Sequence, residues 1–580
     1  MRRKVRAVFI ALALAATSVR AQSTPVDTAP VVRGQVLHRN MSAGRSATFA
    51  LRVDSGEFVR VIVETRGFHA DFTVISPAGE RLLSIEGMVD ERQIVPVEAR
   101  STGTYRLVVA SSGPVVGDGR YTVEASSVTR SALAAEADSI RGWLQGHSVG
   151  LKRVLPNAPY DDLLPLIHAL RGVRVIGLGE STHGTHEYRV MAHRLFAFLA
   201  TRMNVRVFAI ESSYPSVLAI NKYVLSGVGD PAEALAGQGY WITNTEEVLD
   251  LIRWMRRFNE KLPEARKLHF MGIDMVHTRL AVEALTEYLR KFGPYKLLEL
   301  ERVAGPLLAW AGAPDKSPPP DSAAWSGAVH TFNELFGFLG VHEAALVRVG
   351  GREAFDTARW HARILAEWAD EVGDEPSPTG TRDAHMADNL IRHLDAMGSD
   401  TRAVIFAHNG HIAGTTDLDH TSKSRWAMGT YLRTRLGSAY YALGMYFSDG
   451  KVWARTIPPR GGPLKVHQIW PAPLGSGEWY LTQVPTSPFF IDFRSTTGPA
   501  VVQRWLASQQ PMRSIGAGYP AHTDSLWHSS FGTVSLKDSY DGIIFFKHTT
   551  AVYPSSTGRS RGHRHVLQFQ FSNSRGHCRR

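Results

Sequence analysis

Side chains that can transfer protons follow four short apolar stretches of the sequence. In chain order they are Glu180, His183, Glu211, Asp274, His408 and His411. An imidazole with a pKa of about 6.5 needs only a small shift to accept a proton near neutral pH, and a neighbouring carboxylate orients it and stabilises the imidazolium. We therefore expect His183 to act as a general base with Glu180 or Glu211 as its partner. Either His408 or His411 would then hold the negative charge that develops on a carbonyl oxygen.

Each of these residues, taken alone, has a structural explanation. The chain contains 24 histidines, and a single histidine is more often a surface residue than a catalyst. The Glu180 carboxylate could cap the following helix, and Asp274 could cap the helix that begins near Thr278. A charged group at the end of an apolar strand is nevertheless costly unless it is paired or lies in a cleft. Such groups after four strands favour one shared site.

The four apolar stretches have the length and composition of buried strands. They are VRVIGLG from Val173, VRVFAI from Val205, LHFMGI from Leu268 and AVIFA from Ala403. Helical patterns fill the intervals between them, which predicts an α/β fold with a largely parallel sheet flanked by helices. Ligands bind beyond the carboxyl ends of the strands of such a sheet, so the polar residues that follow the strands should meet at one edge.

Two further features complete the predicted catalytic domain, to which we assign residues 131–550. The segment from Phe292 to Thr381 is mostly helical, with a break at SPPPDSA, and predicts a helical insertion. Beyond Tyr440, four more strands are expected in YALGMYF, EWYLTQV, FFIDF and YDGIIFFKH.

The segments that flank this domain have different compositions. Residues 1–21 have a basic start, an apolar run and a small-residue cleavage site, which predicts a signal peptide and a secreted or periplasmic protein. Residues 30–127 alternate apolar and polar residues in short runs, which predicts a small all-β sandwich domain. Residues 551–580 are rich in Ser, Gly, Arg and His, which predicts a disordered basic tail.

The net charge of +11 is concentrated at the two ends of the chain. The predicted signal peptide holds five basic residues and the predicted tail holds six, and neither contains Asp or Glu. These residues account for the whole excess of positive charge, so we expect no nucleic-acid partner.

The single cysteine, Cys578, lies in the predicted tail and can form no intrachain disulfide. No segment after the signal peptide is long and apolar enough to predict a membrane span.

Several motifs together resemble the erythromycin esterase family. They are, in chain order, GLGESTHGTHEYRVMAHRLFAFL, FAIESSYP, GIDM, RDAHMADN, AHNGHI and AMGTYLRTRLGSAYYALGMYF, within about residues 161–548. The resemblance implies a metal-independent hydrolase without a cofactor, in which His183 is the general base for a water that attacks a lactone carbonyl. The other site residues that it implies are Glu180, Glu211, His408 and His411.

One position departs from the family pattern. The family often has a basic residue nine positions after the general base, and this position is Ala192 here. His193 and Arg194 are close by and Arg189 lies one helical turn earlier, so any of the three could take the place of the missing cation. Together with Asp274 and Arg382, these arginines are the candidates for substrate binding.

The segment of predicted strands near the N-terminus resembles the bacterial pre-peptidase C-terminal type of β-domain. The similarity lies in the PAGE turn at Pro77 and the GTYRLVV strand at Gly103. It implies an accessory domain that binds a surface or polymer, or that adds stability. Neither this domain nor an export signal is needed to destroy a drug that acts on cytoplasmic ribosomes. The expected substrate is therefore a small ester or lactone, of which a macrolide is one candidate.

A zinc-dependent hydrolase is the main mechanistic alternative. The five residues Glu180, His183, Glu211, His408 and His411 could supply three or four zinc ligands. The spacing in HNGH is, however, not one of the standard zinc signatures.

A second alternative is a non-enzymatic binding protein of the cell surface, with the β-domain as its adhesive part. The grouping of a base with carboxylates argues against it, because a binding module needs no such pair.

A serine nucleophile is not expected at Ser148, although GHSVG matches the esterase pattern G-x-S-x-G. This segment follows a predicted helix and therefore lacks the strand, turn and helix that expose such a serine.

Overall fold

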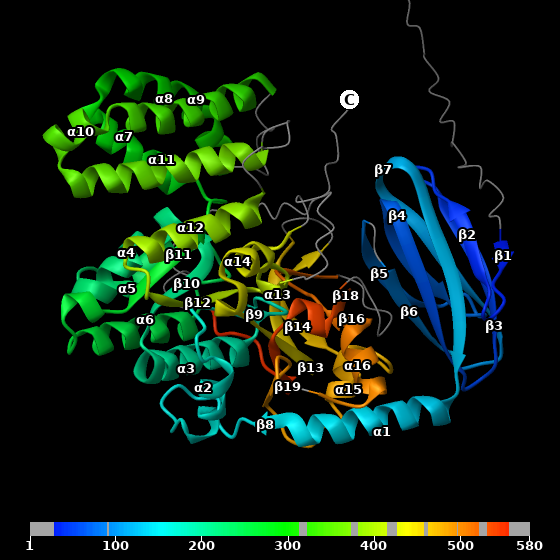
Figure 1. Ribbon diagram of the computed structural model, residues 1–580. Helices are drawn as coiled ribbons and strands as arrows, with labels where there is room; N and C mark the ends of the chain where they lie inside the picture. Colours follow the sequence, from blue (N-terminus) through cyan, green and yellow to red (C-terminus); the bar gives the residue numbers. More distant parts are fainter. Residues whose placement is uncertain are drawn as a thin grey trace, which may run out of the picture.

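The computed structural model describes residues 28–89, 92–312, 322–372, 381–414, 426–457, 462–495, 497–520 and 530–555. The predicted signal peptide, the prolines of SPPPDSA and the predicted tail from residue 556 onward lie outside the described residues. Figure 1 shows an N-terminal β unit, a central sheet with helices, and a group of helices beyond it. Within the described part of the chain, no helix is both long and apolar enough to cross a membrane.

The N-terminal β unit comprises residues 28–128. Its strands are β1 (Thr28–Pro30), β2 (Val36–Asn40), β3 (Ser46–Val53), β4 (Phe58–Ile75), β5 (Arg81–Val89), β6 (Arg92–Glu98) and β7 (Gly103–Val128). The long strands β4 and β7 pair antiparallel; β7 also pairs with β2 and β3, and β4 with β5 and β6. All seven strands therefore belong to one hydrogen-bonded sheet, whereas the sandwich prediction had two. The long strands curve around the core of the unit (Figure 1).

The central sheet has ten strands. They are β8 (Ser148–Gly150), β9 (Val175–Glu180), β10 (Val205–Ser213), β11 (His269–Asp274), β12 (Arg402–His408), β13 (Tyr440–Ile457), β14 (Leu464–Ile469), β15 (Phe489–Asp492), β17 (Gly518–Pro520) and β19 (Gly542–Thr549). The main order is β11-β10-β12-β9-β13-β19-β15-β8. The six strands from β11 to β19 in this order are parallel, which confirms the predicted parallel sheet. Strand β15 is antiparallel to β19, and β8 is antiparallel to β15.

Helices lie beside this sheet and form a separate group at one end of the molecule. Those near the sheet are α2 (Pro165–Ala169), α3 (His186–Met203), α4 (Tyr214–Ser226), α5 (Pro231–Gly237), α6 (Glu246–Asn259), α12 (Arg382–Ala396), α13 (Asn409–Ile412) and α14 (Met428–Leu436). The separate group is α7 (Arg279–Phe292), α8 (Pro294–Gly312), α9 (Ser322–Val341), α10 (Glu343–Gly350) and α11 (Arg352–Val372). It contains the predicted helical insertion, which begins one helix earlier than expected (Figure 1).

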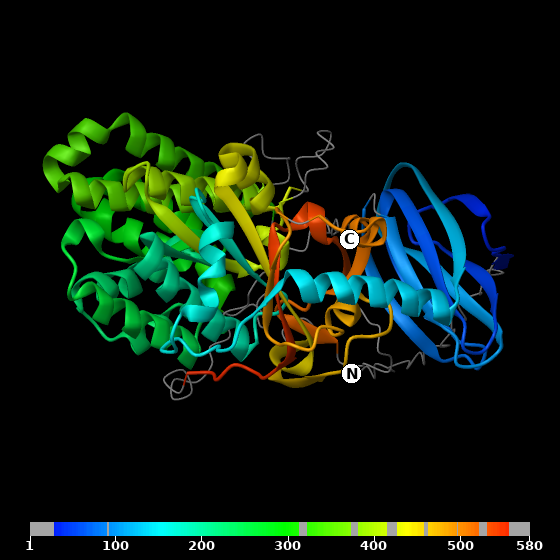
Figure 2. The ribbon, with the colours of Figure 1, turned by 60° about the horizontal axis from the view of Figure 1, so that its bottom comes forward.

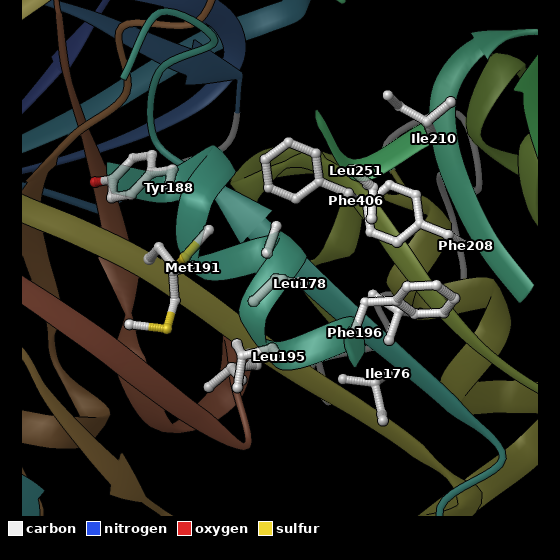
Figure 3. Close-up of a cluster of buried hydrophobic side chains, with 14 of the residues drawn as sticks. Ile176, Leu178, Tyr188, Met191, Leu195, Phe196, Phe208, Ile210, Leu251 and Phe406 are labelled. Carbon is white, nitrogen blue, oxygen red and sulfur yellow. The ribbon is translucent and has the colours of Figure 1, made fainter. Parts of the chain in front are cut away.

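The core between α3 and the sheet supports the strand ends. The ring of Phe196 on α3 lies 5.1 Å from that of Phe208 on β10, and Phe208 lies 6.3 Å from Phe406 on β12. Leu178 and Ile210 belong to the same buried cluster (Figure 3). Burial of each such side chain contributes about 1.5–3 kcal/mol. The ends of β9, β10 and β12 are thus held on a closely packed base.

The C-terminal half contains a short hairpin and small helices. They are β16 (Gln509–Arg513), β18 (Phe531–Ser535), α15 (Gly477–Leu481), α16 (Ala500–Ala507) and α17 (Leu536–Ser539). The strand predicted in EWYLTQV is wrong, because this segment contains α15. The hydroxyl of Ser476 accepts a hydrogen bond from the Trp479 N–H at 3.1 Å and caps this helix. Such a cap outweighs the alternation of apolar residues.

The segment after β19 corrects the predicted start of the disordered tail. Residues 551–555 were assigned to the tail, but Thr550–Ser555 follow the first turns of α3 and α6. The Val552 N–H donates to the Gly184 carbonyl at 3.1 Å and the Ser555 N–H to the Asn244 carbonyl at 3.1 Å. Backbone hydrogen bonds of this kind fix the segment in place.

Candidate active site

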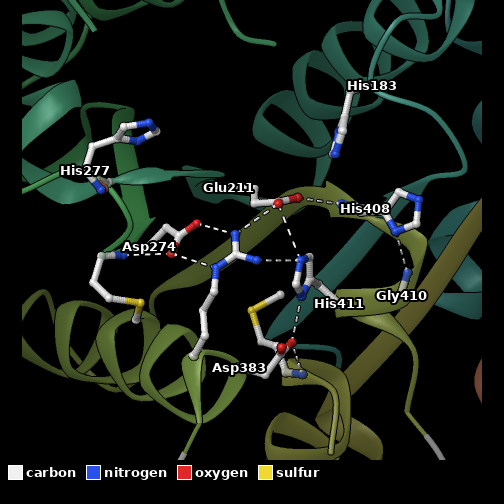
Figure 4. Close-up of polar contacts among 12 residues, drawn as sticks. His183, Glu211, Asp274, His277, Asp383, His408, Gly410 and His411 are labelled. Atoms are coloured by element: carbon white, nitrogen blue, oxygen red, sulfur yellow. Dashed lines mark hydrogen bonds and ion pairs between the residues drawn. The ribbon is translucent and has the colours of Figure 1, made fainter. Parts of the chain in front are cut away.

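The carboxyl ends of β9, β10, β11 and β12 meet at one edge of the central sheet (Figure 4). The parallel register places Glu180 beside His408 and Ser213 beside Asp274. The six proton-transferring residues expected at strand ends therefore lie in one region, as predicted.

Glu180 and His183 form a buried pair. The Nδ1 atom of His183 lies 2.7 Å from Oε1 of Glu180, and both side chains are only 2% exposed. An ionised carboxylate accepts only, so in the neutral form of the ring Nδ1 carries the proton and Nε2 keeps its lone pair. The guanidinium of Arg189 donates to the His183 carbonyl at 2.8 Å and to Glu180 Oε1 at 3.5 Å. This arrangement presents Nε2 of His183 as a proton acceptor.

The backbone around His183 is held by chain segments that are distant in sequence. The His183 N–H donates to the Gly516 carbonyl at 3.1 Å, and the Ile515 N–H donates to the Ser181 carbonyl at 2.8 Å. The Trp453 N–H donates to the Gly184 carbonyl at 3.0 Å. A Cβ atom at Gly184 would lie 1.8 Å from the Trp453 carbonyl oxygen, so only glycine fits this close approach. The loop conformation thus depends on backbone contacts.

Arg382, at the start of α12, lies between two carboxylates. Its Nε donates to Oδ1 of Asp274 at 3.0 Å, and one terminal nitrogen donates to Oδ2 of Asp274 at 2.5 Å. The same nitrogen lies 3.2 Å from Oε1 of Glu211. The fork on Asp274 fixes the plane of the guanidinium. Asp274 therefore orients Arg382. The role in substrate binding predicted for Asp274 would be indirect, through this arginine.

His411 is held between Asp383 and Glu211. Its Nδ1 lies 2.8 Å from Oδ1 of Asp383, and its Nε2 lies 3.4 Å from Oε1 of Glu211. Burial alone would lower the pKa of His411, but the charges of Asp383 and Glu211 raise it to about 10. The same cluster keeps the pKa of Glu211 well below its usual value, because His411, His183 and Arg382 outweigh burial. The raised pKa favours the protonated form of His411 at neutral pH, while Nε2 also lies 3.2 Å from a terminal nitrogen of Arg382, a donor that only the neutral ring can accept.

His408 has the opposite protonation behaviour. Burial, together with the positive charge that His183 can carry, lowers the pKa of His408 to about 3. Its Nδ1 accepts a hydrogen bond from the Gly410 N–H at 3.2 Å, so the neutral ring carries its proton on Nε2. This Nε2 is buried and makes no hydrogen bond of good geometry among the described residues, although the Ser181 backbone is near enough to raise the pKa of the ring. The rings of His408 and His183 are 5.4 Å apart, so this donor lies next to the proposed base.

Two residues near the site were not expected there. Asp383 lies in the first turn of α12; its carboxylate lies 2.8 Å from Nδ1 of His411 and accepts the Met428 N–H at 2.8 Å. His277 lies close to Asp274 (Figure 4), packs against Tyr240, and has a pKa lowered to about 4 by burial. The RDAH and GIDMVH motifs contain these residues, but sequence spacing gives no sign of their partners.

Arg194 does not belong to the site, which corrects its prediction as a substrate ligand. Its side chain is fully buried and pairs with Asp162 at 2.6 Å. It also donates to the Arg153 carbonyl at 2.9 Å. Ala192 is part of the hydrophobic core. Of the three basic residues considered for the missing cation, Arg189 reaches Glu180 and the His183 carbonyl. His193 packs against Trp254 instead.

The side chains around Glu211 carry charges that suit an anion better than a metal ion. Within the described ranges, no group of three or more His, Cys, Asp or Glu side chains is arranged to hold a metal. Arg382 already pairs with Glu211, Nδ1 of His411 faces Asp383, and Nε2 of His411 lies between Glu211 and the Arg382 guanidinium. Zinc would have to displace these cations and deprotonate His411. The five residues proposed as zinc ligands therefore fit this ion poorly.

Comparison with known proteins gives the same assignment as the motifs. A relative from Bacillus subtilis (strain 168), named "Putative hydrolase YbfO", is 24% identical over 73% of this chain and 94% of its own length. The erythromycin esterase type II of Escherichia coli is 23% identical over 53% of this chain and 77% of its own. A solved structure of a mutant of the erythromycin esterase EreC, in its open conformation, covers 70% of this chain and 97% of its own at 16% identity. Its TM-score of 0.51 shows a shared fold.

The N-terminal β unit has a weaker match. A pre-peptidase C-terminal domain of a collagenase from Bacillus anthracis covers 18% of this chain at 13% identity and a TM-score of 0.16. A similarity of this size carries no argument, and the accessory role of the β unit stays a prediction.

The family assignment follows from the catalytic part of the chain. The family model described as erythromycin esterase matches residues 200–549. This span covers most of the central sheet, including the strand ends that bear Glu211, Asp274, His408 and His411. The chain belongs to the erythromycin esterase family.

Proposed function

We propose that this protein hydrolyses a carboxylic ester or lactone, with His183 as the general base. The observation that carries the proposal is the buried pair of Glu180 and His183, in which Nδ1 is bound and Nε2 is left to accept a proton. Membership of a hydrolase family supports the reaction class. The lactone, the role of His183 and the absence of a metal requirement belong to the proposal.

The reaction begins with a water molecule next to His183. Nε2 of His183 takes a proton from the water while the water oxygen attacks the carbonyl carbon. Glu180 stabilises the resulting imidazolium through Nδ1. The tetrahedral intermediate then collapses, and His183 returns the proton to the alkoxide that leaves. The products are a carboxylic acid, which ionises, and an alcohol; a lactone opens to a hydroxy acid.

The neighbouring side chains can stabilise the negative charge of the intermediate. The Nε2–H of His408 makes no hydrogen bond of good geometry among the described residues, although the Ser181 backbone is near, and the low pKa of the ring keeps it neutral. One such donor is typically worth about 10²–10³ in rate. Arg382 and His411 add positive charge nearby, and Glu211 keeps both in place while it accepts the His408 N–H at 2.9 Å.

The location and substrate of the enzyme are further parts of the proposal. The signal peptide predicted in residues 1–21 supports a secreted or periplasmic enzyme. The proposed substrate is a small extracellular ester or lactone, and macrolides are candidates because the E. coli relative is named an erythromycin esterase. No nucleic acid is proposed as a partner.

Hydrolysis of a panel of compounds tests the proposal. The purified protein and His183→Asn are incubated with macrolides, simple lactones and aryl esters. Mass spectrometry detects ring-opened lactones heavier by one water, and the separate acid and phenol from each aryl ester. We expect turnover by the native protein and a rate about 10²–10⁴ lower in His183→Asn. His342→Asn is the matched control, because this exposed histidine lies between α9 and α10. Equal rates in all three proteins would refute the role of His183.

A further inference from the structure

The hairpin formed by β16 and β18 belongs to the catalytic half in sequence but packs on the N-terminal β unit. The side chain of Phe531, at the start of β18, is 1% exposed and is part of the hydrophobic core of the β unit. Strand β16 lies against β6, and β18 lies against β5 (Figure 1). The position of the hairpin is therefore set by the β unit.

The chain that leaves this hairpin holds the loop of the catalytic base. Residues 514–516 follow β16 directly, and Gly516 accepts the His183 N–H while Ile515 and Gly516 donate to the Ser181 carbonyl. Thr182 and Gly516 form an isolated parallel bridge. The three residues 514–516 thus connect the end of β16 to the backbone of His183.

Arg513, the last residue of β16, contacts both the hairpin and the surrounding part of the catalytic half. Its guanidinium lies over the ring of Phe531 at 4.8 Å and near the ring of Phe447 at 5.8 Å. It donates to the Trp470 carbonyl at 2.6 Å, and its N–H donates to the buried carboxylate of Glu478 at 2.6 Å. A buried arginine stacked on an aromatic ring is a stiff link, because its guanidinium plane is fixed.

Two more contacts fix the β unit relative to the central sheet. Helix α1 (Arg130–His147) leads from the β unit along the catalytic half (Figure 2). Arg60 of β4 makes two hydrogen bonds to Glu136 of α1, at 2.8 and 3.2 Å, and a third to the hydroxyl of Tyr480 at 2.7 Å. The ring of Phe58 packs on Gly475, where a Cβ atom would lie 2.5 Å from it. The β unit cannot shift without loss of these contacts.

We propose that the N-terminal β unit is a positioning element of the active site, which aims His183 through Phe531, Arg513 and Gly516. This inference rests on the proposed function of His183. The β16–β18 hairpin packs against the β unit, which sets its position. A displacement of the β unit would therefore shift the hairpin and, through it, the backbone of His183. A displacement of about 1 Å at a catalytic group can lower a rate about 10²-fold, so small shifts suffice.

Two substitutions in the same core separate positioning from general stability. Phe531→Leu weakens the packing of the hairpin in the core of the β unit. Phe49→Leu removes the same side-chain volume from the same core, but at β3, where the Phe49 ring contacts Tyr121. We expect Phe531→Leu to lower kcat about tenfold with KM within about twofold, because binding groups stay in place while the base is misaligned. Phe49→Leu should lower the melting temperature by a similar amount and leave kcat unchanged.

Hydrogen–deuterium exchange gives a readout that does not need a substrate. The amides of His183, Ile515 and Gly516 should exchange about tenfold faster in Phe531→Leu than in the native protein or Phe49→Leu, because the link that protects them is loosened. If the native protein hydrolyses nothing, the proposed function fails while exchange still decides this inference. Unchanged exchange and kcat in Phe531→Leu, or equal changes in both variants, would overturn it. Phe531→Met replaces Phe531→Leu in both measurements if the latter does not fold.

Discussion

The charge of His411 depends on Asp383, and this gives a prediction with a calculable size. In Asp383→Asn the carboxylate next to Nδ1 is replaced by a neutral amide, which can still accept the Met428 N–H. The two atoms are 2.8 Å apart. With charge centres about 4 Å apart and an effective dielectric constant of about 20, the lost attraction is about 4 kcal/mol. The pKa of His411 should therefore fall by about 3, from about 10 to about 7.

The assay is an NMR titration of protein labelled at the histidine ring carbons, with the His411 signal assigned by its loss in His411→Gln. Asp395→Asn is the control, because it removes the same charge from α12 at an exposed pair with Arg174. In the native protein and in this control, His411 should stay protonated from pH 6 to pH 9. In Asp383→Asn, kcat/KM should also fall as the pH rises through about 7, since Glu211 loses one of its cations. A native pKa near 6.5, or no shift in Asp383→Asn, would refute the reasoning.

Three further predictions follow from the buried charges. Arg194→Met should lower the free energy of unfolding in urea by about 3–5 kcal/mol, because it leaves Asp162 buried without its partner, and the folded fraction should keep its KM. The pKa of His411 is raised on folding, so its contribution to the free energy of unfolding should be complete below about pH 6.5 and lost as the pH rises through about 10. The free energy of unfolding of His411→Gln should not show this decrease at alkaline pH. Hydrolysis should survive exhaustive chelation with no metal found by elemental analysis, because Arg382 already pairs with Glu211; restoration of a lost activity by zinc would contradict this.

The sequence predicted the candidate site because strand ends can be recognised. An apolar run followed by a charged residue identified Glu180, Glu211, Asp274 and His408, and a parallel sheet brings such ends together. The motif resemblance added the roles of His183 and His411. The same reasoning placed Arg194 in the site, because it lies on the same helix as Arg189. Its partner Asp162 lies in a segment without any pattern.

Contacts between distant segments could not be predicted in this way. Asp383 has the position of a residue that favours a helix start, and only the folded chain brings His411 to its carboxylate. The segment around Trp479 alternates like a strand, yet a local cap from Ser476 makes it helical. The packing of Phe531 in the β unit depends on tertiary structure alone, since periodicity describes single elements and not their partners.

The order of strands in the central sheet has a consequence for the growing chain. Strand β9, which ends at Glu180 of the proposed pair, has β12 and β13 as neighbours, and Thr182 is bridged to Gly516, which lies 334 residues further along. Contacts of such long range close late in folding. During synthesis the proposed base should therefore stay unaligned until residues 514–516 have been made, so a translation product that ends before residue 514 should be inactive.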